Sequence, residues 1–496
     1  MDFLNPKKKR AHLIRLYIGY ALMAVALIAG TLILVFSAYG YDIDHKTGGI
    51  IQNGLVILDA HPEAASIIVN GVNKGTTSNR LVIPAGQYSV ELQSNGYRTW
   101  KHTFNLEGSS IEQLVYPFLF PSKLATKSVQ DYAAAPAFAS ESSDRHWLII
   151  QVPGSDNNFS TVDLTTAKHP TTAFSLPLDA LTSTPGTSSF EPVEWAGDNV
   201  HLLLKHVFAG GTEFIMLDRE NPENSLNLNR IFATQPITSI SLRDNKADQL
   251  YLFNAADGHL LQADSKSGAA TLLLQHVLTY KSYQSNTVVY TTNPTSSPTD
   301  VEVHVHQDTQ DYLLRTLPAA SDYLLDIDSF SGHLYLASGS RANGRTYLYK
   351  DPFSDFNHHP ARTPQPFRVL IVAGAQYISF SLNTRFVAVQ GSSSFAVYDA
   401  ETDRQFRYDT KLPLEPNQKA VWMDGHRLTL MSGGIVNVFD FDGTNLQPLS
   451  PGLAGLTPFF DHDYTAMLTL AASSGAADKV SLTRTELKVL PPGTAQ

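Results

Sequence analysis

The sequence predicts a mainly β protein with a single transmembrane helix near its N-terminus. The helix is predicted by an uninterrupted apolar run, and the β class by many short apolar stretches separated by turn residues. A recurring pair of such stretches in the C-terminal three quarters predicts a β-propeller. The expected parts are a cytoplasmic basic N-terminus at 1–15, a transmembrane helix at 16–39, a stalk at 40–53, a small β-sandwich at 54–118, a linker at 119–140 and the propeller at 141–490.

The apolar run covers residues 16–36 and contains neither a charge nor a proline. As a helix it is about 31 Å long, enough to cross a hydrocarbon core of roughly 30 Å. Lys7 to Arg10 and Arg15 precede it, and Asp42 and Asp44 follow it. Basic residues favour the cytoplasmic side, so we expect the N-terminus inside the cell and everything from about Tyr41 onward outside.

A cleaved signal peptide is the alternative for this segment. Signal peptides usually have an apolar core of about 7–15 residues and a small residue at position −3 before the cleavage site. The run is longer than that, and cleavage after Ala38 would put the bulky Phe36 at −3. The pattern therefore favours an uncleaved anchor, through which residues 16–39 make the membrane a partner.

The composition of the remaining chain narrows the function classes. About 455 residues lie beyond the anchor, too many for one hydrophobic core. Of the 36 basic and 46 acidic residues, only five and one lie in the first 40, so the rest is net negative by about 14. Such a surface argues against a nucleic-acid partner. The absence of cysteine excludes disulfides, thiol catalysis and cysteine-ligated zinc.

The region after the stalk has the pattern of short strands joined by tight turns. Tyr88, Val90 and Leu92 alternate with polar residues, as in a half-buried strand. Asn70-Gly71 and Asn95-Gly96 are strong turn dipeptides. Five or so such strands predict a compact antiparallel sandwich.

The same elements resemble the PEGA domain family over residues 54 to about 118. The matching stretches are Gly54-Leu-Val-Ile, Pro62-Glu63-Ala64-Ala65, Val69-Asn70-Gly71, Gly75-Thr76-Thr77, Pro84-Ala85-Gly86 and Gly96-Tyr97. Ala64 stands where the family has glycine, so the turn there need not have a positive φ. Ser78 departs from the proline often found after the threonine. The resemblance implies an adhesive or spacer module of the bacterial cell envelope and no catalysis.

The large C-terminal region repeats a unit of two apolar strands separated by polar loops. The middle strands begin near residues 147, 202, 250, 287, 334, 386, 428 and 467. Their spacing centres near ~46 residues, which suits propeller blades and fits either seven or eight of them. WD40 and kelch signatures are absent, and the units resemble the loosely patterned blades of TolB/YVTN-type propellers. Two stacked β-sandwiches are the alternative.

Three stretches contain residue types that occur in metal or catalytic sites. His304 and His306 are two apart on a strand and share a face, but no third metal ligand is fixed, which favours a solvated strand face. His358-His359 lies in a loop that we expect to be exposed. Asp440 to Gly443 resembles the start of a calcium loop without the downstream glutamate, and is better read as a turn between blade strands. The sequence therefore predicts no catalytic, cofactor-binding or metal-binding residue and no cofactor.

These observations predict an anchored extracytoplasmic protein of the cell envelope. We expect it to bind or adhere to protein or glycan partners through the PEGA-like domain and the propeller loops, without being an enzyme. A propeller-type glycosidase or lyase acting on envelope polysaccharide is the alternative, and it requires paired carboxylates or a metal in a central pocket. A passive scaffold with flat propeller faces is the third hypothesis.

Overall fold

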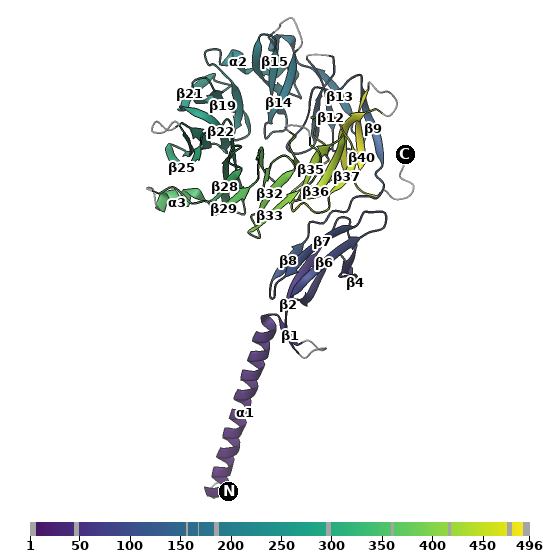
Figure 1. Cartoon of the computed structure of the whole chain (residues 1–496), viewed down its shortest axis with the longest axis vertical. Coiled ribbons are helices and arrows are strands. Elements are labelled where there is room, and N and C mark those ends of the chain that lie inside the picture. The colour runs from purple at the N-terminus through teal and green to yellow at the C-terminus, as the bar shows by residue number, and fades with distance from the viewer. Residues whose placement is uncertain are drawn as a thin grey trace. The chain divides into compact units, whose positions relative to one another are not determined.

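The computed structural model describes residues 6–43, 49–154, 157–166, 168–182, 188–293, 299–358, 362–414, 418–473 and 479–489. The chain divides into two compact units, residues 1–123 with 489–496 and residues 124–488 (Figure 1). The first unit contains the N-terminal helix and the small β domain. The second contains the repeated strands.

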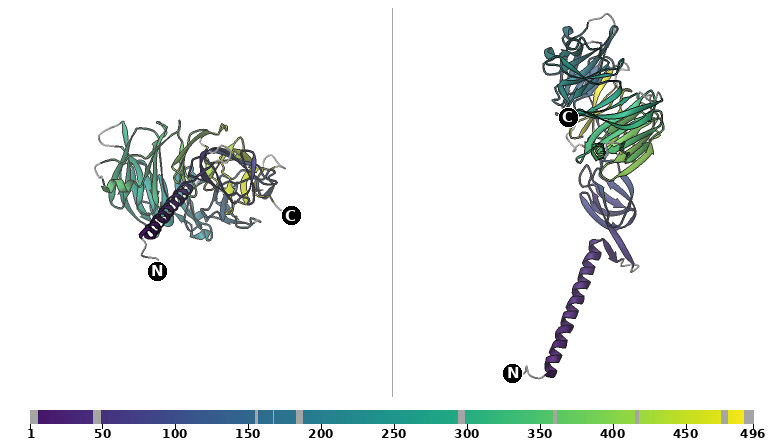
Figure 2. Two further views of the ribbon diagram at one scale, coloured as in Figure 1. Left: turned by 90° about the horizontal axis from the view of Figure 1, so that it is seen from below. Right: turned by 90° about the vertical axis from the view of Figure 1, so that its left-hand side faces the viewer.

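The first unit begins with one long helix, α1 (Pro6–Ala38). Figure 2 shows it as an uninterrupted rod. Lys9–Ala38 is long and apolar enough to cross a membrane, a property that it shares with signal sequences. Its apolar side chains are exposed to the surroundings, as expected for a helix whose partner is lipid.

The segment expected as a stalk is partly strand. The helix ends at Ala38, and Gly40, which has a φ of 73°, leads the chain into β1 (Tyr41–Ile43). This strand pairs antiparallel with the start of β2 (Ile50–Leu58). The segment 40–53, predicted as a short stalk, therefore has main-chain pairing near both of its ends.

Two sheets form the small domain. One contains β1, β2 and β5, with β8 paired to β2, and the other has the order β4-β3-β6-β7. The further strands are β3 (Ser66–Val69), β4 (Val72–Thr76), β5 (Asn79–Pro84), β6 (Gly86–Gln93), β7 (Trp100–Leu106) and β8 (Ile111–Leu114). Val56, Ile67 and Leu92 are buried in its core. The predicted sandwich is confirmed, except that β8 runs parallel to β2. Ala64 has a φ of 60°, so this turn keeps the left-handed backbone that we expected the alanine to relax.

Within the described residues, the second unit consists of eight four-stranded antiparallel sheets. Blade 1 contains β10 (Ala139–Glu141), β11 (Trp147–Gln151), β12 (Asn158–Asp163) and β13 (Thr171–Ser175), and blade 2 contains β14 (Ser189–Trp195), β15 (His201–Phe208), β16 (Gly211–Asp218) and β17 (Leu226–Asn227). Blade 3 contains β18 (Ser239–Arg243), β19 (Lys246–Asn254), β20 (His259–Asp264) and β21 (Ala269–Leu274), and blade 4 contains β22 (Val277–Tyr283), β23 (Thr287–Thr292), β24 (Asp300–Gln307) and β25 (Gln310–Pro318).

Blades 5 to 8 continue the pattern. Blade 5 contains β26 (Tyr323–Phe330), β27 (His333–Ser340), β28 (Arg345–Lys350) and β29 (Arg368–Ile371), and blade 6 contains β30 (Tyr377–Phe380), β31 (Phe386–Gln390), β32 (Ser394–Asp399) and β33 (Arg404–Asp409). Blade 7 contains β34 (Val421–Trp422), β35 (Arg427–Ser432), β36 (Ile435–Asp440) and β37 (Gln447–Pro451), and blade 8 contains β38 (Phe459–Phe460), β39 (Ala466–Ala472) and β40 (Val480–Glu486) together with β9 (Thr126–Tyr132). Short helices α2 (Leu228–Ile231) and α3 (Pro352–His358) and the 3₁₀ turns η2 (Leu178–Ala180) and η3 (Pro222–Asn224) connect strands.

The sheets follow one another in a circle, from teal through green to yellow in Figure 1. Buried apolar clusters fill the space between neighbouring sheets, and the last packs on the first through Leu468 and Leu470 against Leu148 and Ile150. The prediction of a propeller is confirmed, with eight blades. A pair of stacked sandwiches is excluded, because each sheet packs between two others.

The last blade takes its outer strand from the beginning of the unit. β9 pairs with β40, with Gln130 opposite Leu482 and Tyr132 opposite Val480. The prediction of a linker over 119–140 is therefore wrong for β9 and for the start of β10. The first strand of the propeller unit, β9, and its last strand, β40, thus lie side by side in one sheet, and their backbone hydrogen bonds close the ring of blades.

Candidate functional site

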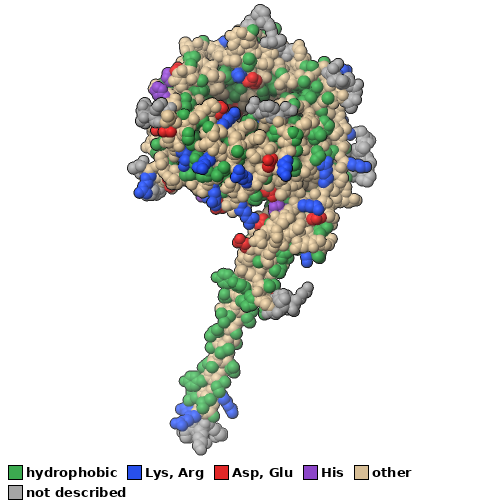
Figure 3. Space-filling view, in the orientation of Figure 1, with side chains coloured by type: hydrophobic (Ala, Val, Ile, Leu, Met, Phe, Trp, Pro, Cys, Tyr) green, Lys and Arg blue, Asp and Glu red, His purple; other side chains and the backbone are tan. Residues whose placement is uncertain are grey.

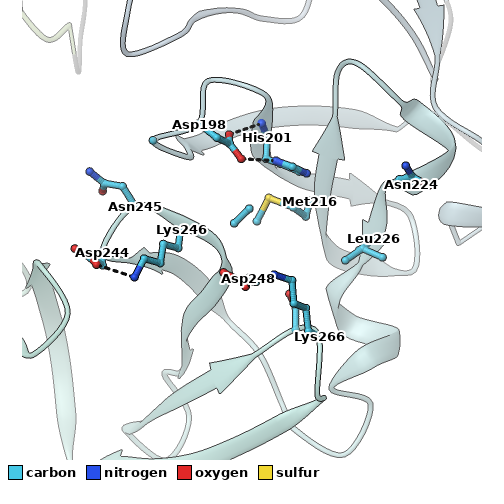
Figure 4. A pocket seen from close by; sticks show the side chains of 13 residues that line it. Asp198, His201, Met216, Asn224, Leu226, Asp244, Asn245, Lys246, Asp248 and Lys266 are labelled. Atoms are coloured by element: carbon cyan, nitrogen blue, oxygen red, sulfur yellow. Dashed lines mark hydrogen bonds and ion pairs between the residues drawn. The ribbon is translucent and has the colours of Figure 1, made fainter.

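Two neighbouring pockets lie where blades 2, 3 and 4 meet. The outer pocket has a volume of about 490 Å³ and lies between blades 2 and 3 (Figure 4). The inner pocket has a volume of about 470 Å³ and is lined by β14, β18 and β22, the innermost strands of three consecutive blades. Both are within the size range of small-ligand sites in proteins.

The outer pocket has an apolar floor and a charged rim. Met216 of β16, Leu226 of β17 and Ala247 of β19 supply the apolar surface. The charged side chains come from tight turns, at Asp198, Asp244 and Lys266, and from the starts of the strands β15 and β19 that follow two of these turns, at His201, Lys246 and Asp248 (Figure 4). An apolar floor with polar groups around it can bind a ligand that has both kinds of surface.

The ionisable groups of this rim are arranged in pairs. Lys266 Nζ lies 2.6 Å from Asp248 Oδ2, and the carboxylate raises the pKa of Lys266 through their hydrogen bond. Lys246 Nζ lies 3.1 Å from Asp244 Oδ2. Pairing leaves the rim close to neutral, so no single strong charge dominates the pocket.

Asp198 and His201 form the third pair of the rim, at the start of β15. His201 Nδ1 lies 2.7 Å from Asp198 Oδ2. Although burial opposes the shift, hydrogen bonds from the backbone N–H groups of His201 and Val200 lower the pKa of Asp198. The aspartate therefore caps its own turn as well as orienting the imidazole.

The inner pocket is polar and carries a partly buried carboxyl group. Glu194 Oε2 accepts a hydrogen bond of 2.9 Å from the backbone N–H of Leu242, and burial raises the pKa of Glu194. Ser241 and Tyr280 share a hydrogen bond of 2.9 Å between their hydroxyl oxygens. Burial raises the pKa of Tyr280 to about 12, so this hydroxyl keeps its proton at neutral pH.

A group of charged side chains continues along the innermost strands from this pocket. Lys281 Nζ lies 3.7 Å from Asp326 Oδ1 of β26. Burial raises the pKa of Asp326, and Lys281 and Lys419 oppose that rise. Asp328 is two residues further on the same strand, and burial together with the charge of Asp326 raises its pKa. The wall of the propeller centre therefore holds two carboxyl groups on one strand face, with lysines opposite.

The β18–β19 turn joins the two pockets. Asp244 and Asn245 line both of them and have φ values of 58° and 54°, as in a two-residue hairpin turn of type I′. The backbone N–H of Gly197, in the corresponding turn of blade 2, donates a hydrogen bond of 2.7 Å to the carbonyl of Asn245. The two pockets thus share this turn as a common wall, and a hydrogen bond ties it to the turn of blade 2. We call this pair of pockets the blade 2–3 groove.

A second polar cluster ties blades 7, 8 and 1 together. Arg145 Nη2 donates a hydrogen bond of 2.7 Å to the carbonyl of Met423, and its guanidinium lies 4.9 Å from the ring centre of Tyr464. Glu141 accepts a 3.0 Å hydrogen bond from the backbone N–H of Phe460, and burial raises the pKa of Glu141 to about 7. These contacts cross the junction where the ring closes, so we assign them a structural role.

His304 and His306, singled out from the sequence, lie on β24 of blade 4. His304 Nδ1 is 2.6 Å from Asp311 Oδ2, and its Nε2 is 3.1 Å from Glu302 Oε2. Only 16% of the His304 side chain and 11% of the His306 side chain are exposed, so the expected solvated strand face is wrong at both residues. Burial alone would lower the pKa of His304, but the hydrogen bonds and negative charges of Asp311 and Glu302 outweigh it and raise the pKa.

The remaining candidates of the sequence carry no site. Asp440 is the last residue of β36, and residues 441–443 lie in the turn that follows it, as predicted. His359 and the side chain of His358 lie outside the described residues. Among the side chains that the structure describes, no group of three histidine, aspartate or glutamate residues is arranged to hold a metal ion.

Sequence reasoning missed the residues of the blade 2–3 groove. They come from three blades and from turns that look like ordinary hairpin connections. The one available signal was Asp244-Asn245, a turn dipeptide flanked by Arg243 and Lys246. Nothing in this dipeptide indicates that the turn lines two pockets.

A comparison with known families supports the assignment of the small domain. The PEGA domain family matches residues 53–114, in agreement with the resemblance drawn from the turns of the small domain. A search of curated proteins found no significant match. Solved structures similar to the chain include an oligogalacturonate lyase in complex with manganese, at 11% identity and a TM-score of 0.39 over 74% of this chain and 96% of that one.

Another similar structure is the Swd1 β-propeller domain of Myceliophteria thermophila, at 9% identity and a TM-score of 0.36 over 74% of this chain and 100% of that one. The tricorn protease matches at 11% identity and a TM-score of 0.36, over 73% of this chain and 38% of that one. At such scores these similarities carry no argument about function.

Proposed function

We propose that the protein is a membrane-anchored, extracytoplasmic binding or scaffold protein of the bacterial cell envelope. In this proposal α1 stays in the membrane, the PEGA-like domain acts as a spacer next to it, and the propeller takes a protein or glycan ligand in the blade 2–3 groove. The basic residues before the apolar run support the orientation.

The proposal depends on the two adjacent pockets of the blade 2–3 groove. They share the β18–β19 turn, which a hydrogen bond from the Gly197 backbone holds in place. Loops held by a rigid scaffold are the usual place for recognition, because they bind without first having to be ordered. The rim charges of the outer pocket are paired, as at Lys266 and Asp248, and its floor is apolar. A ligand with polar edges and an apolar face, such as a sugar chain or a peptide, fits this surface.

A second candidate, a propeller-type glycosidase or lyase acting on envelope polysaccharide, is favoured by Asp326 and Asp328. Their raised pKa values move them towards the protonated form that a general acid needs. If this second function holds, Asp326→Asn abolishes breakdown of polysaccharide while binding persists. If the binding function holds, purified protein leaves the polysaccharide intact and Asp326→Asn changes nothing.

The test of the binding function is a screen of the full chain, in detergent, against envelope glycans and an envelope extract. Leu226→Trp fills the floor of the outer pocket and should weaken retention of a ligand at least about tenfold, which corresponds to 1.4 kcal/mol. Lys266→Ala removes one rim charge and should weaken it a few fold.

Arg368→Ala is the matched control for Lys266→Ala. Arg368 is also a base that lies 2.6 Å from an aspartate, Asp403, and its side chain is partly exposed, but it is on blade 5. The control variant should retain the ligand at the level of the unmodified protein. Equal losses in both variants, or no ligand retained by the unmodified chain, would contradict a role of the groove.

A further inference from the structure

The hairpin of β1 and β2 presents an apolar face at the end of α1. Tyr41 and Ile43 point to one side of β1, and Ile50 lies directly opposite Ile43 on β2. The exposed fractions of these residues are 40% for Tyr41, 54% for Ile43 and 68% for Ile50. Asp42 lies on the other side, where its carboxylate accepts a hydrogen bond from Asn53. Gln52 lies opposite Tyr41 on this side, and Ile51 lies opposite Asp42 on the other side. The side with Tyr41, Ile43 and Ile50 is therefore the more apolar of the two, and these three residues are exposed on it.

This face continues the apolar surface of the helix. The ring of Phe36, in the last turn of α1, stacks on the ring of Tyr41 with 5.0 Å between their centres. Figure 3 shows hydrophobic side chains along α1 up to its junction with the small domain. The apolar run 16–36 matches the thickness of the hydrocarbon core, which puts the next residues at the level of the lipid headgroups. Tyrosine is enriched at that level.

The hairpin is fixed to the end of the helix by hydrogen bonds. The carbonyl of Tyr39 accepts hydrogen bonds from Gln52 Nε2, at 3.2 Å, and from Ser109 Oγ. The backbone N–H of Asn53 donates to the carbonyl of Gly40 at 2.7 Å. Gly40 has a positive φ, and a Cβ there would lie 2.8 Å from the carbonyl oxygen of Asn53. Close approach of the two backbones at a glycine holds the sheet in one orientation at the helix end.

We propose that the face formed by Tyr41, Ile43 and Ile50 lies in the headgroup region of the lipid bilayer. The occupant is a lipid surface because the face is continuous with the surface of α1 through Phe36, and because the clamp at Tyr39 and Gly40 ties it to the point where the helix leaves the hydrocarbon core. The small domain is thereby seated on the membrane. The inference rests on the proposed anchoring by α1.

The absence of cysteine from the chain makes a site-specific test possible. The full chain is prepared with single substitutions Ile43→Cys, Ile50→Cys, Val72→Cys or Leu27→Cys, labelled with an environment-sensitive fluorophore and placed in phosphatidylcholine nanodiscs. The discs carry a nitroxide either on the lipid headgroup or in the middle of the acyl chain. Val72 is the matched control, since it is an exposed apolar residue (55%) on β4, in the other sheet of the same domain.

The proposal predicts that the headgroup nitroxide quenches the labels at 43 and 50 at least threefold more than the label at 72. The label at 27 should be quenched by the acyl-chain nitroxide. Equal quenching at 43, 50 and 72, with quenching at 27 retained, overturns the lipid contact and leaves the anchoring intact. Loss of quenching at 27 overturns the anchoring itself.

Discussion

The hairpin at the end of α1 and the blade 2–3 groove of the propeller have opposite surface chemistry. The hairpin exposes neighbouring apolar side chains, Ile43 opposite Ile50, and turns its polar residue Asp42 to the other side. The groove places its apolar residues at the floor and surrounds them with paired charges such as Lys266 and Asp248. Uncovered apolar surface suits contact with another apolar phase, whereas a neutralised polar rim suits an aqueous ligand site. In the proposed function, the hairpin thus faces lipid and the groove faces an aqueous ligand.

The comparison first requires that exposed and buried apolar side chains differ in their effect on stability. Phe386 is fully buried between blades 6 and 7, with its ring centre 4.2 Å from that of Phe441. Phe386→Ala should lower the free energy of unfolding of the propeller by about 3–5 kcal/mol, because it leaves a cavity. Val82→Ala on the small domain, where the side chain is 68% exposed, should change stability by no more than about 0.5 kcal/mol.

Urea unfolding of the full chain in detergent measures both variants, with near-ultraviolet circular dichroism reporting on the aromatic core. Similar decreases in the free energy of unfolding for the two variants would contradict this prediction, since Val82 would then contribute to stability as a buried core residue does.

The second prediction concerns a buried charge of the propeller. Glu213 accepts hydrogen bonds from His206 at 2.8 Å and from the hydroxyl of Thr182 at 2.7 Å. Although burial opposes the shift, these donors lower the pKa of Glu213 to about 2. Glu213→Gln should cost about 3 kcal/mol at neutral pH, because it breaks a buried network of charge-assisted hydrogen bonds.

The depressed pKa of Glu213 also sets a pH window. Its stabilising contribution is present above the unfolded value of 4.5 and is lost as the pH falls towards 2. Denaturation midpoints measured between pH 7 and pH 2.5 should converge for the variant and the unmodified protein. A constant difference over this range would count against an ionised Glu213.

The third prediction sharpens the account of the hairpin. Gly40→Ala forces a side chain into a left-handed backbone and against the carbonyl of Asn53. The left-handed conformation alone costs roughly 1–2 kcal/mol. Hydrogen–deuterium exchange of the β1 and β2 amides in nanodiscs should become faster, while that of β6 stays unchanged. Unchanged exchange in β1 would contradict the role of the Tyr39 and Gly40 hydrogen bonds in fixing the hairpin to the end of α1.

The smallest expected effect is at His304. Asp311 and Glu302 raise its pKa, so its stabilising contribution is present below the unfolded value of 6.5 and is lost as the pH rises through the higher folded value. His304→Gln should therefore lower the stability by about 1 kcal/mol at pH 5.5 and have less effect at pH 9. Thermal unfolding at both pH values provides the measurement. A larger loss at pH 9 than at pH 5.5 would contradict a charged imidazolium in the fold.

The parts of the fold that local patterns encode were predictable from the sequence. The Asn70-Gly71 turn and the alternation of Tyr88, Val90 and Leu92 predicted the small sandwich, and recurring strand pairs predicted the propeller. β9 was missed because Thr126–Tyr132 is mostly polar, as an outermost strand is, and its partner β40 lies some 350 residues later. Pairing over that distance leaves no local signal.

The candidate site was hardly predictable for a related reason. The blade 2–3 groove depends on which blades are neighbours and on the turn at Asp244 and Asn245 facing the turn at Gly197. His304 was placed on the correct element, but its partner Asp311 comes from the next strand, and only the register of β24 and β25 brings the two together. Spacing along the chain fixes the face of a residue but not its cross-strand partner.

The topology of the chain in the membrane tests the central claim most directly. Single cysteines at an exposed propeller residue, Leu178→Cys, and before the apolar run, Arg10→Cys, are treated with a membrane-impermeant maleimide on right-side-out vesicles. The account predicts that the cysteine at 178 is labelled at once and that the cysteine at 10 is labelled only after the membrane is permeabilised. Labelling of 178 only after permeabilisation, or loss of residue 10 from the mature protein, would contradict an anchored protein with an external propeller.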